Sequence, residues 1–333
     1  MALLLGCGGI SLAVTPFPEQ FSASRLPVRQ PAQAADAADL PDQLLYAVST
    51  RLDRIGRIIV PVTINGRGPF RFMLDTGASG TALADSAQAR LGPLPDAGAP
   101  ISVLGVSGSA VLAAVHVDRL DAGEMHFRDL DLPVLAGPVL AGIDGILGMD
   151  SVDGMRMSAD FVHNKVTIVE SHGRRASSQY GVVRVEFLSK RVLMSEAYVG
   201  GVRVKTIFDT GGPRTVGNPA LLAALRRYRA KDEPLLETQV TDVTQTSQPG
   251  KVVRVPTVQL GAASINDLYV TFGDFDIFKI WGLDDQPALL IGMDALGTLA
   301  ELTIDYRRKE LQMLPRDPVA AVHLQVAREA PAR

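Results

Sequence analysis

Short runs of apolar residues, separated by turn residues, recur along most of this chain. The segment 57–66 has the pattern of a strand that ends in an Asn-Gly turn, and 192–201 has the same pattern with a Gly-Gly turn. Each turn leads into a second apolar run, which is the pattern of a β-hairpin. Further short runs with Gly, Asn and Asp between them follow in both halves. The sequence therefore predicts a mostly β protein.

The second strand of each hairpin runs into the same tripeptide. Asp75-Thr76-Gly77 follows the apolar run 72–74, and Asp209-Thr210-Gly211 follows 206–208. Each tripeptide has the same distant partner, two apolar residues followed by Gly-Met-Asp. These partners are Ile146, Leu147 and Gly148 in the first copy and Leu290, Ile291 and Gly292 in the second. Two matched motifs in matched contexts indicate an internal duplication.

The duplication continues into later segments and sets the expected domain organisation. Paired strands are predicted at 157–161 and 165–168, and again at 302–306 and 310–313. Helices are predicted at 83–91 and at 219–230, the second with Pro219 in its first turn. Asp150 and Asp294 are interpreted as polar caps of short helical turns. The expected division is a leader (1–42), an N-terminal lobe (43–170), a linker (171–180), a C-terminal lobe (181–315) and a loose tail (316–333).

Composition agrees with two lobes and excludes several classes of function. A chain of 333 residues can hold two domain-sized cores. Aromatic residues make up only 5%, so aliphatic side chains must fill those cores. With 33 basic and 36 acidic residues there is no electrostatic footprint for nucleic acid. The five histidines lack metal-ligand spacing, so no metal site is predicted.

The paired motifs resemble those of the retroviral-type aspartic proteases, two copies of which are fused in the bilobal pepsin-like enzymes. The resemblance covers roughly 45–315. It implies a bilobal acid-protease fold with two retropepsin-like β-barrel lobes, short helices and a cleft between the lobes. It also implies an aspartic endopeptidase with catalytic Asp75 and Asp209, a peptide or protein substrate and no cofactor. Because one chain supplies both Asp loops, the expected active unit is a monomer.

The chemistry of that family explains the residue types. Two carboxylates held close together share a proton, so that one is ionised and the other is protonated. The ionised group takes a proton from water, and the protonated group stabilises the charge that develops on the peptide carbonyl. Gly77 and Gly211 permit a tight turn, and the resemblance implies that Thr76 and Thr210 cross-link the two loops. A single tripeptide would equally predict an Asx-turn at a strand end.

Two departures from the family pattern concern the Asp loops. Ser79 occupies the position of a serine that hydrogen-bonds the catalytic carboxylate in many pepsin-like enzymes, but the second copy has Pro213 there. Proline has neither an N–H group nor a hydroxyl. The fourth motif residue is Ala78 in one copy and Gly212 in the other, and neither offers a hydroxyl. The sequence predicts unequal support for the two carboxylates.

A third departure concerns the hairpin that covers the substrate. The candidate flap lacks the aromatic residue that pepsin-like flaps carry, as does its counterpart, 243–251. These departures motivate an alternative hypothesis, a non-catalytic peptide-binding or envelope-associated protein that keeps the fold. The candidate flap residues are Gly105, Val106, Ser107 and Gly108.

The N-terminus has the composition of an export signal. Residues 1–14 are apolar and 15–42 are rich in Pro, Gln and Ala. The apolar stretch is too short to span a bilayer but suits a signal peptide. Leu4 to Cys7 resembles a lipobox, in which the only cysteine would carry a lipid anchor, and Ala32-Gln33-Ala34 is an alternative cleavage site. A leader that is retained in a soluble protein is the third interpretation; export to the periplasm or envelope is the expectation.

Overall fold

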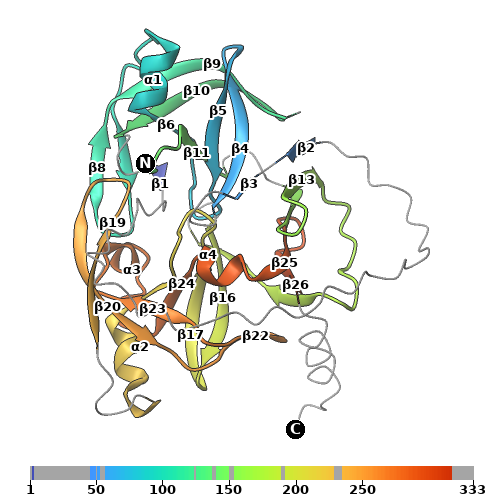
Figure 1. The fold of residues 1–333 in the computed structure, drawn as a ribbon, viewed down its shortest axis with the longest axis vertical. Helices are drawn as coiled ribbons and strands as arrows, with labels where there is room; N and C mark the ends of the chain where they lie inside the picture. The colour runs from blue at the N-terminus through green and yellow to red at the C-terminus, as the bar shows by residue number, and fades with distance from the viewer. Residues whose placement is uncertain are drawn as a thin grey trace, which may run out of the picture.

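The computed structural model describes residues 2–3, 46–49, 51–52, 57–123, 125–136, 140–149, 154–188, 192–228 and 235–316. The expectations about Cys7, the alternative cleavage site, Asp150 and the tail beyond 316 lie outside the described residues. Within them the protein is mostly β and has two lobes, as predicted (Figure 1). No helix in these ranges is long and apolar enough to cross a membrane.

Six strands of the first half close into a barrel. Neighbouring strands are hydrogen-bonded, and a pairing between the first and last closes the ring. In order they are β4 (Ile58–Ile64), β5 (Arg67–Leu74), β11 (Gly145–Leu147), β6 (Ala82–Ala84), β10 (Met125–Leu135) and β9 (Ala114–Ala122). The short strand β3 (Arg51–Leu52) extends the sheet beyond β4.

The second half repeats this arrangement with its long strands broken. The central strands are β16 (Val192–Val199), β17 (Val202–Phe208), β24 (Ala288–Ile291) and β18 (Val216–Gly217). One end continues through β23 (Tyr269–Phe272), β20 (Ser247–Arg254) and β19 (Leu236–Thr241), and the other through β21 (Val258–Leu260) and β22 (Ala263–Ile265). A further strand, β15 (Glu186–Leu188), pairs with β16.

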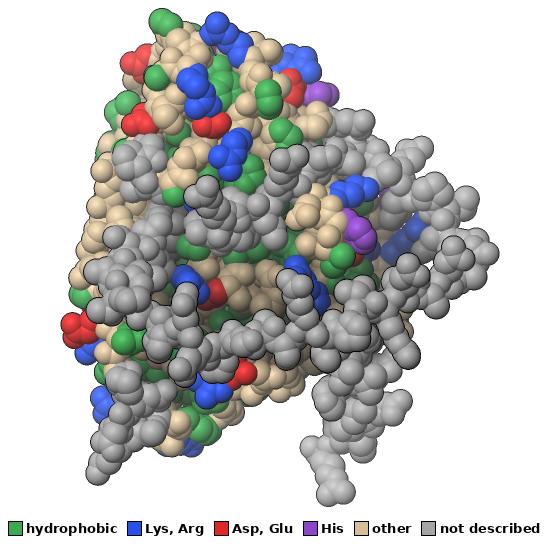
Figure 2. Space-filling view, viewed as in Figure 1, with side chains coloured by type: hydrophobic (Ala, Val, Ile, Leu, Met, Phe, Trp, Pro, Cys, Tyr) green, Lys and Arg blue, Asp and Glu red, His purple; other side chains and the backbone are tan. Residues whose placement is uncertain are grey.

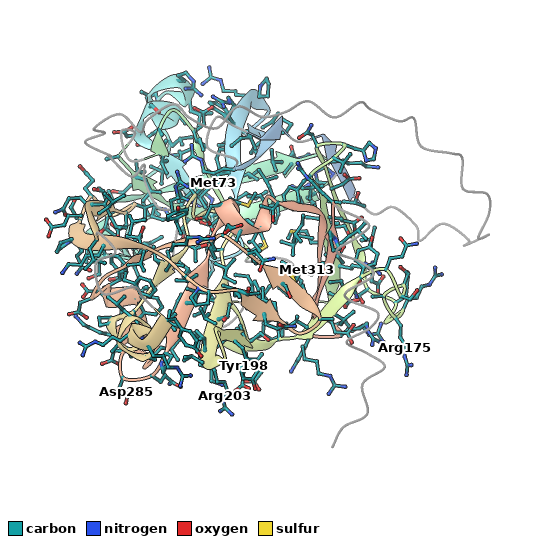
Figure 3. The ribbon with its side chains drawn as sticks, turned by 60° about the horizontal axis from the view of Figure 1, so that its bottom comes forward. Met73, Arg175, Tyr198, Arg203, Asp285 and Met313 are labelled. Carbon is teal, nitrogen blue, oxygen red and sulfur yellow. The ribbon has the colours of Figure 1, made fainter. Side chains whose placement is uncertain are left out.

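The two predicted hairpin turns form for a local reason. Asn65 and Gly66 have φ angles of 48° and 74°, and Gly200 and Gly201 have φ angles of 54° and 84°. Two successive positive φ values are what a tight two-residue hairpin turn requires, and Asn and Gly adopt them most readily. In the second hairpin Tyr198 pairs with Arg203, and both lie at the end farthest from the first lobe (Figure 3).

A six-stranded sheet joins the halves. Three strands come from each half, in the order β14 (Gly181–Arg184), β26 (Glu310–Pro315), β25 (Leu299–Asp305), β12 (Met155–Asp160), β13 (Lys165–Glu170) and β2 (Tyr46–Ser49). At its centre β12 and β25 are antiparallel, and Ser158 lies opposite Thr303. These two residues occupy equivalent positions in the duplicated sequence, and their hydroxyls are 2.5 Å apart. Where a residue lies opposite the equivalent residue of the other half, the pseudo-twofold axis between the halves passes between them.

The helices are shorter than the sequence predicted. Helix α1 (Asp85–Leu91) begins two residues late, because 82–84 form the barrel strand β6. Helix α2 (Pro219–Ala224) starts at Pro219 as predicted, and the Asn218 side chain accepts a hydrogen bond from Leu221 N at its start. The chain then continues as a 3₁₀ turn, η3 (Arg226–Tyr228). A third helix, α3 (Asp276–Ile280), was not predicted.

Two further hairpins project from the barrels toward each other. One consists of β7 (Ile101–Leu104) and β8 (Ser109–Leu112), and the strand β1 (Ala2–Leu3) pairs in parallel with β7. The other is β19 with β20. Their tips meet along one side of the molecule (Figure 1). On the face shown in Figure 2, acidic and basic side chains of the described residues are interspersed.

Candidate active site

The two Asp-Thr-Gly loops begin where β5 and β17 end. The second apolar element of each half runs in parallel beside that strand: β11 pairs with β5, and β24 pairs with β17. Asp75 N donates to the carbonyl of Leu147 (3.1 Å), and Asp209 N donates to that of Ile291 (2.9 Å). In both halves, therefore, the apolar-Gly element lies directly against the Asp loop.

The glycines of these elements are needed because backbone approaches backbone. A Cβ at Gly148 would overlap the backbone of Gly80, and one at Gly292 would lie 2.7 Å from the carbonyl oxygen of Gly212. Non-bonded atoms do not approach so closely, so a larger residue would push the two segments apart. The next residue completes the contact in the second half, where Met293 N donates to Gly212 O (2.7 Å).

Each loop holds its carboxylate through its own backbone. The Oδ1 atom of Asp75 accepts from Gly77 N (2.8 Å) and Ala78 N (3.0 Å). The Oδ1 atom of Asp209 accepts in the same way from Gly211 N (2.8 Å) and Gly212 N (2.9 Å). This is the Asx-turn that a single tripeptide predicts. The turn and the candidate chemistry are compatible. Because the turn fixes Oδ1 of each Asp, the position of Oδ2 is fixed as well.

The threonines join the two loops reciprocally. Thr76 N donates to Thr210 Oγ1 (3.0 Å), and Thr76 Oγ1 donates to the carbonyl of Phe208 (3.0 Å). Thr210 N donates to Thr76 Oγ1 (3.0 Å), and Thr210 Oγ1 donates to the carbonyl of Leu74 (2.9 Å). Both threonines are buried, so these four bonds form without competition from water. The inward-pointing arrangement that the resemblance implied is present.

This brace places the two carboxyl groups together. The Asp75 carboxylate lies so close to Gly211 that a Cβ there would overlap it. Both aspartates have 0% exposure. Oδ2 of Asp209 is buried and accepts no amide or hydroxyl hydrogen bond from the described residues, whereas the Asp75 carboxyl group lies within hydrogen-bonding reach.

Electrostatics in this site favour a retained proton. Burial raises the pKa of Asp209 well above its ordinary value, and the negative charge of Asp75 and the hydrogen bond with it raise the pKa further. The amides of Gly212 and Gly211 act in the opposite direction but do not reverse the shift. Two buried carboxyl groups with such a raised pKa favour a state in which one of them is protonated.

A second layer of polar contacts was missed by the sequence interpretation. Thr81 and Thr215 occupy the same position in the two copies, six residues after each Asp. Thr81 Oγ1 accepts from Gly148 N (3.2 Å), and Thr215 Oγ1 accepts from Gly292 N (3.2 Å). Their recurrence at one motif position was the signal that could have identified them. They tie each Asp loop to its apolar-Gly partner.

One expectation about this layer is corrected. The helical turn predicted at Asp294 forms as α4 (Met293–Leu296), but Gly292 occupies its N-cap. The Asp294 carboxylate instead accepts from Thr215 N (3.0 Å) and Thr215 Oγ1 (2.7 Å). A buried threonine with two donors is a better partner for this partly buried carboxylate than one helix amide. Its role is to support the loop.

The loops differ at their fourth and fifth residues, although backbone amides hold both carboxylates in the same way. Ser79 is half-buried in the first loop, and Pro213 is buried at the equivalent place in the second. At the fourth position the first loop has the methyl group of Ala78, which is buried. In the second loop a Cβ at Gly212 would lie 2.7 Å from Asp209 Oδ2, so a side chain is excluded there. The two carboxylates therefore have different immediate surroundings.

The predicted flap residues 105–108 form the turn between β7 and β8. The counterpart turn spans 242–246, between β19 and β20, so the predicted stretch 243–251 began one residue too late and missed Asp242. Val106 belongs to the same buried apolar cluster as Val216 and Leu290, which flank the Asp209 loop. The first hairpin therefore reaches across to the second lobe.

Comparison with known protein families agrees with this geometry. The family model described as "Aspartyl protease" matches the chain twice, at residues 60–151 and 195–295, which together make up more than half of its length. Each match contains one Asp-Thr-Gly loop and its apolar-Gly partner. No curated protein matches the chain. The duplicated unit, the two braced Asp loops and the double family match show that the chain belongs to the aspartyl protease family.

Proposed function

We propose that the protein is an aspartic endopeptidase in which Asp75 and Asp209 activate water to hydrolyse a peptide bond. The observation that carries this proposal is the buried pair of carboxyl groups, which the reciprocal threonine contacts bring together and in which burial and the charge of Asp75 raise the pKa of Asp209. A buried turn with only a structural purpose has no reason to place a second carboxyl group beside the first, since their mutual repulsion is unfavourable.

In the proposed reaction the two groups have complementary roles. The protonated Asp209 donates a hydrogen bond to the scissile carbonyl oxygen, and the ionised Asp75 accepts a proton from the attacking water. Because Gly77, Ala78, Gly211 and Gly212 hold one oxygen of each carboxylate, neither group needs to reorient when charge develops. The proposed substrate is an extended segment of a peptide or protein, and the proposed active unit is the monomer, since one chain contributes both loops.

The alternative is a peptide-binding protein without turnover. Two observations favour it: both carboxyl groups have 0% exposure, and the tips of the two hairpins are closed on each other. A binding protein of this kind would keep the closed site but would not need the ionisable pair. Removal of the charge of one of these carboxyl groups should therefore abolish cleavage by a peptidase but leave peptide binding by a binding protein unchanged.

Replacement of either carboxylate by its amide tests the proposal. Asp75→Asn and Asp209→Asn should each lower kcat for a peptide substrate by at least about a thousandfold, because each removes one partner of a two-group acid–base system. The double variant should be little worse than either single variant, since the pair acts as one unit. Turnover is measured by mass spectrometry of a peptide library after incubation with each purified protein.

The matched control is Asp294→Asn, which changes a partly buried carboxylate of the same loop region that is not proposed to react. It should keep measurable turnover, while binding of a statine-type transition-state mimic should depend on both Asp75 and Asp209. Wild-type protein that binds peptides without cleaving any of them, with both Asn variants binding equally well, would favour the non-catalytic alternative.

A further inference from the structure

The tips of the two hairpins are joined by a buried carboxylate. Asp242, in the turn of the second-lobe hairpin, has 0% exposure. Its Oδ2 atom accepts from Ser107 N (2.7 Å) and Gly108 N (3.1 Å), which belong to the turn of the first-lobe hairpin. The Ser107 hydroxyl donates back to the carbonyl of Val240 (3.1 Å). Three hydrogen bonds therefore cross between the lobes at this point.

The same carboxylate also fixes its own turn. Its Oδ1 atom accepts from Thr244 N (2.8 Å) and from Thr244 Oγ1 (2.6 Å). Asp242 N donates to the carbonyl of Thr246 (3.1 Å), which closes the turn. One oxygen is thus committed to each hairpin, and the orientation of the carboxylate is fully determined by its four donors.

Glycine makes this close approach geometrically feasible. A Cβ at Gly105 would overlap the Asp242 carboxylate, and a Cβ at Gly108 would lie 2.7 Å from Thr246 Oγ1. Neither position requires glycine for its φ angle, since neither has a positive φ. The glycines of the first tip are therefore explained by the neighbouring lobe.

Apolar packing supports the contact from the other side. Val106, at the tip of the first hairpin, is fully buried and belongs to a cluster with Phe275, Ile277 and Phe278 of the second lobe. Ile277 N donates to the carbonyl of Val106 (3.1 Å). The helix α3 carries two of these residues, Ile277 and Phe278. The first hairpin is therefore held at two points by the second lobe.

The energetics of this contact favour reversible closure. A buried carboxylate is tolerated when hydrogen bonds replace its hydration, and here four donors do so. If the hairpins separate, water can replace the two donors that come from Ser107 and Gly108. The free-energy difference between the open and closed states is consequently much smaller than the number of hydrogen bonds implies.

We propose that Asp242 is a positioning residue for the peptidase reaction, a clasp that fixes the 105–108 turn beside the catalytic pair and must release to admit an extended peptide. This inference rests on the proposed function, because it assigns the closed hairpins to substrate entry and retention. The carboxylate and the apolar residues that pack around Val106 both belong to the second lobe, so this lobe holds the tip of the first-lobe hairpin.

Amide hydrogen exchange tests the clasp without reference to activity. In the wild-type protein the amides of Ser107 and Gly108 should be protected, and in Asp242→Ala they should exchange at least about tenfold faster. Gly105→Ala should have the same effect from the other lobe, because its new methyl group displaces the carboxylate. Thr241→Val is the control: it removes an exposed hydroxyl contact with Ser247 in the same hairpin and should leave exchange at 107 and 108 unchanged. Unchanged exchange in both clasp variants would overturn the proposal.

Kinetics test the positioning role. Asp242→Ala should lower kcat by about tenfold or more while KM changes less than about threefold, since the clasp fixes the 105–108 turn and does not contact the reacting atoms. Asp242→Asn, which keeps one acceptor oxygen, should recover part of the loss, and Thr241→Val should behave as wild type. Normal kcat in Asp242→Ala would contradict a positioning role.

A reversible cross-link tests the requirement for opening. In a Cys7→Ser background, Gly108→Cys with Thr246→Cys places two thiols at the clasp, where the Cβ atoms built on the backbone are 2.9 Å apart and need a small shift to reach disulfide geometry. The oxidised protein should lose turnover, and reductant should restore it. Full activity in the cross-linked form would show that opening is not required. Absence of turnover in every form, wild type included, would reject the proposed function, while the exchange measurement would still decide on the clasp.

Discussion

At the scale of single residues, the defining feature is that burial and proximity act on the same two carboxyl groups. Asp209 is buried, receives two amide hydrogen bonds and lies beside Asp75. The amides favour the ionised form, but burial and the neighbouring charge oppose it more strongly and raise the pKa of Asp209. The raised pKa of Asp209 is therefore a direct consequence of where the threonine brace places these side chains.

This raised pKa predicts a pH dependence of stability. The folded state holds a proton that the unfolded chain releases near pH 3.8, so the stabilisation is complete below that pH and is lost as pH rises through the raised pKa. Between pH 3.8 and the raised pKa, the free energy of unfolding should fall by up to about 1.4 kcal/mol for each pH unit. In Asp209→Asn the slope should disappear, because the amide stays neutral and its NH₂ group can donate to Asp75. Urea unfolding of both proteins from pH 4 to 7 measures this, and a constant stability difference across the range would contradict it.

At the scale of elements, the four threonine hydrogen bonds are what bring two separate barrels to one point. The hydroxyl of Thr210 accepts from Thr76 N and donates to Leu74 O, so each hydroxyl satisfies two backbone groups of the opposite loop. Backbone groups buried at strand ends need such partners, because no water reaches them.

Thr210→Val keeps nearly the same side-chain shape but removes the hydroxyl. It should therefore destabilise the protein through lost hydrogen bonds. It leaves Thr76 N and Leu74 O buried without a partner, at about 1–3 kcal/mol for each group. Thr210→Ser keeps the hydroxyl and loses only a methyl group, at about 1 kcal/mol. The free energy of unfolding in urea should rank wild type, Ser and then Val in decreasing order. Equal stability of the Ser and Val variants would show that the hydroxyl is not holding the loops together.

At the scale of the whole molecule, the two halves share a sheet that neither completes alone. The strands β12 and β25 pair along the pseudo-twofold axis, and three strands lie on each side of it. An isolated half would expose the edge of its central strand, which is a template for pairing with another chain.

Separated halves should consequently need each other. Fragments 43–175 and 176–316 should each self-associate or stay unfolded, and refolding them together should give a one-to-one complex with the circular dichroism spectrum of the intact core. Size-exclusion chromatography with circular dichroism decides this. A single fragment that is a stable, folded monomer would contradict the inference that the shared sheet is required for folding.

The sequence alone determined the features that depend on local conformation and on repetition. The Asn65-Gly66 and Gly200-Gly201 turns follow from which residues tolerate positive φ. The candidate catalytic pair could be predicted because a matched motif and its matched partner occur twice. The helix limits were less well predicted, since 82–84 have helix-compatible residues but are recruited into the barrel as β6.

The tertiary structure decided the features that depend on how the two halves pack. Ser107 and Asp242 are 135 residues apart, and no periodicity links a Gly-Val-Ser-Gly turn to a carboxylate in the other lobe. The same holds for the hydroxyls of Ser158 and Thr303, which meet only because two barrels are related by the pseudo-twofold axis. Local preferences fix turns and strands one at a time, whereas contacts between lobes arise from the shape of complete barrels, which a single segment does not encode.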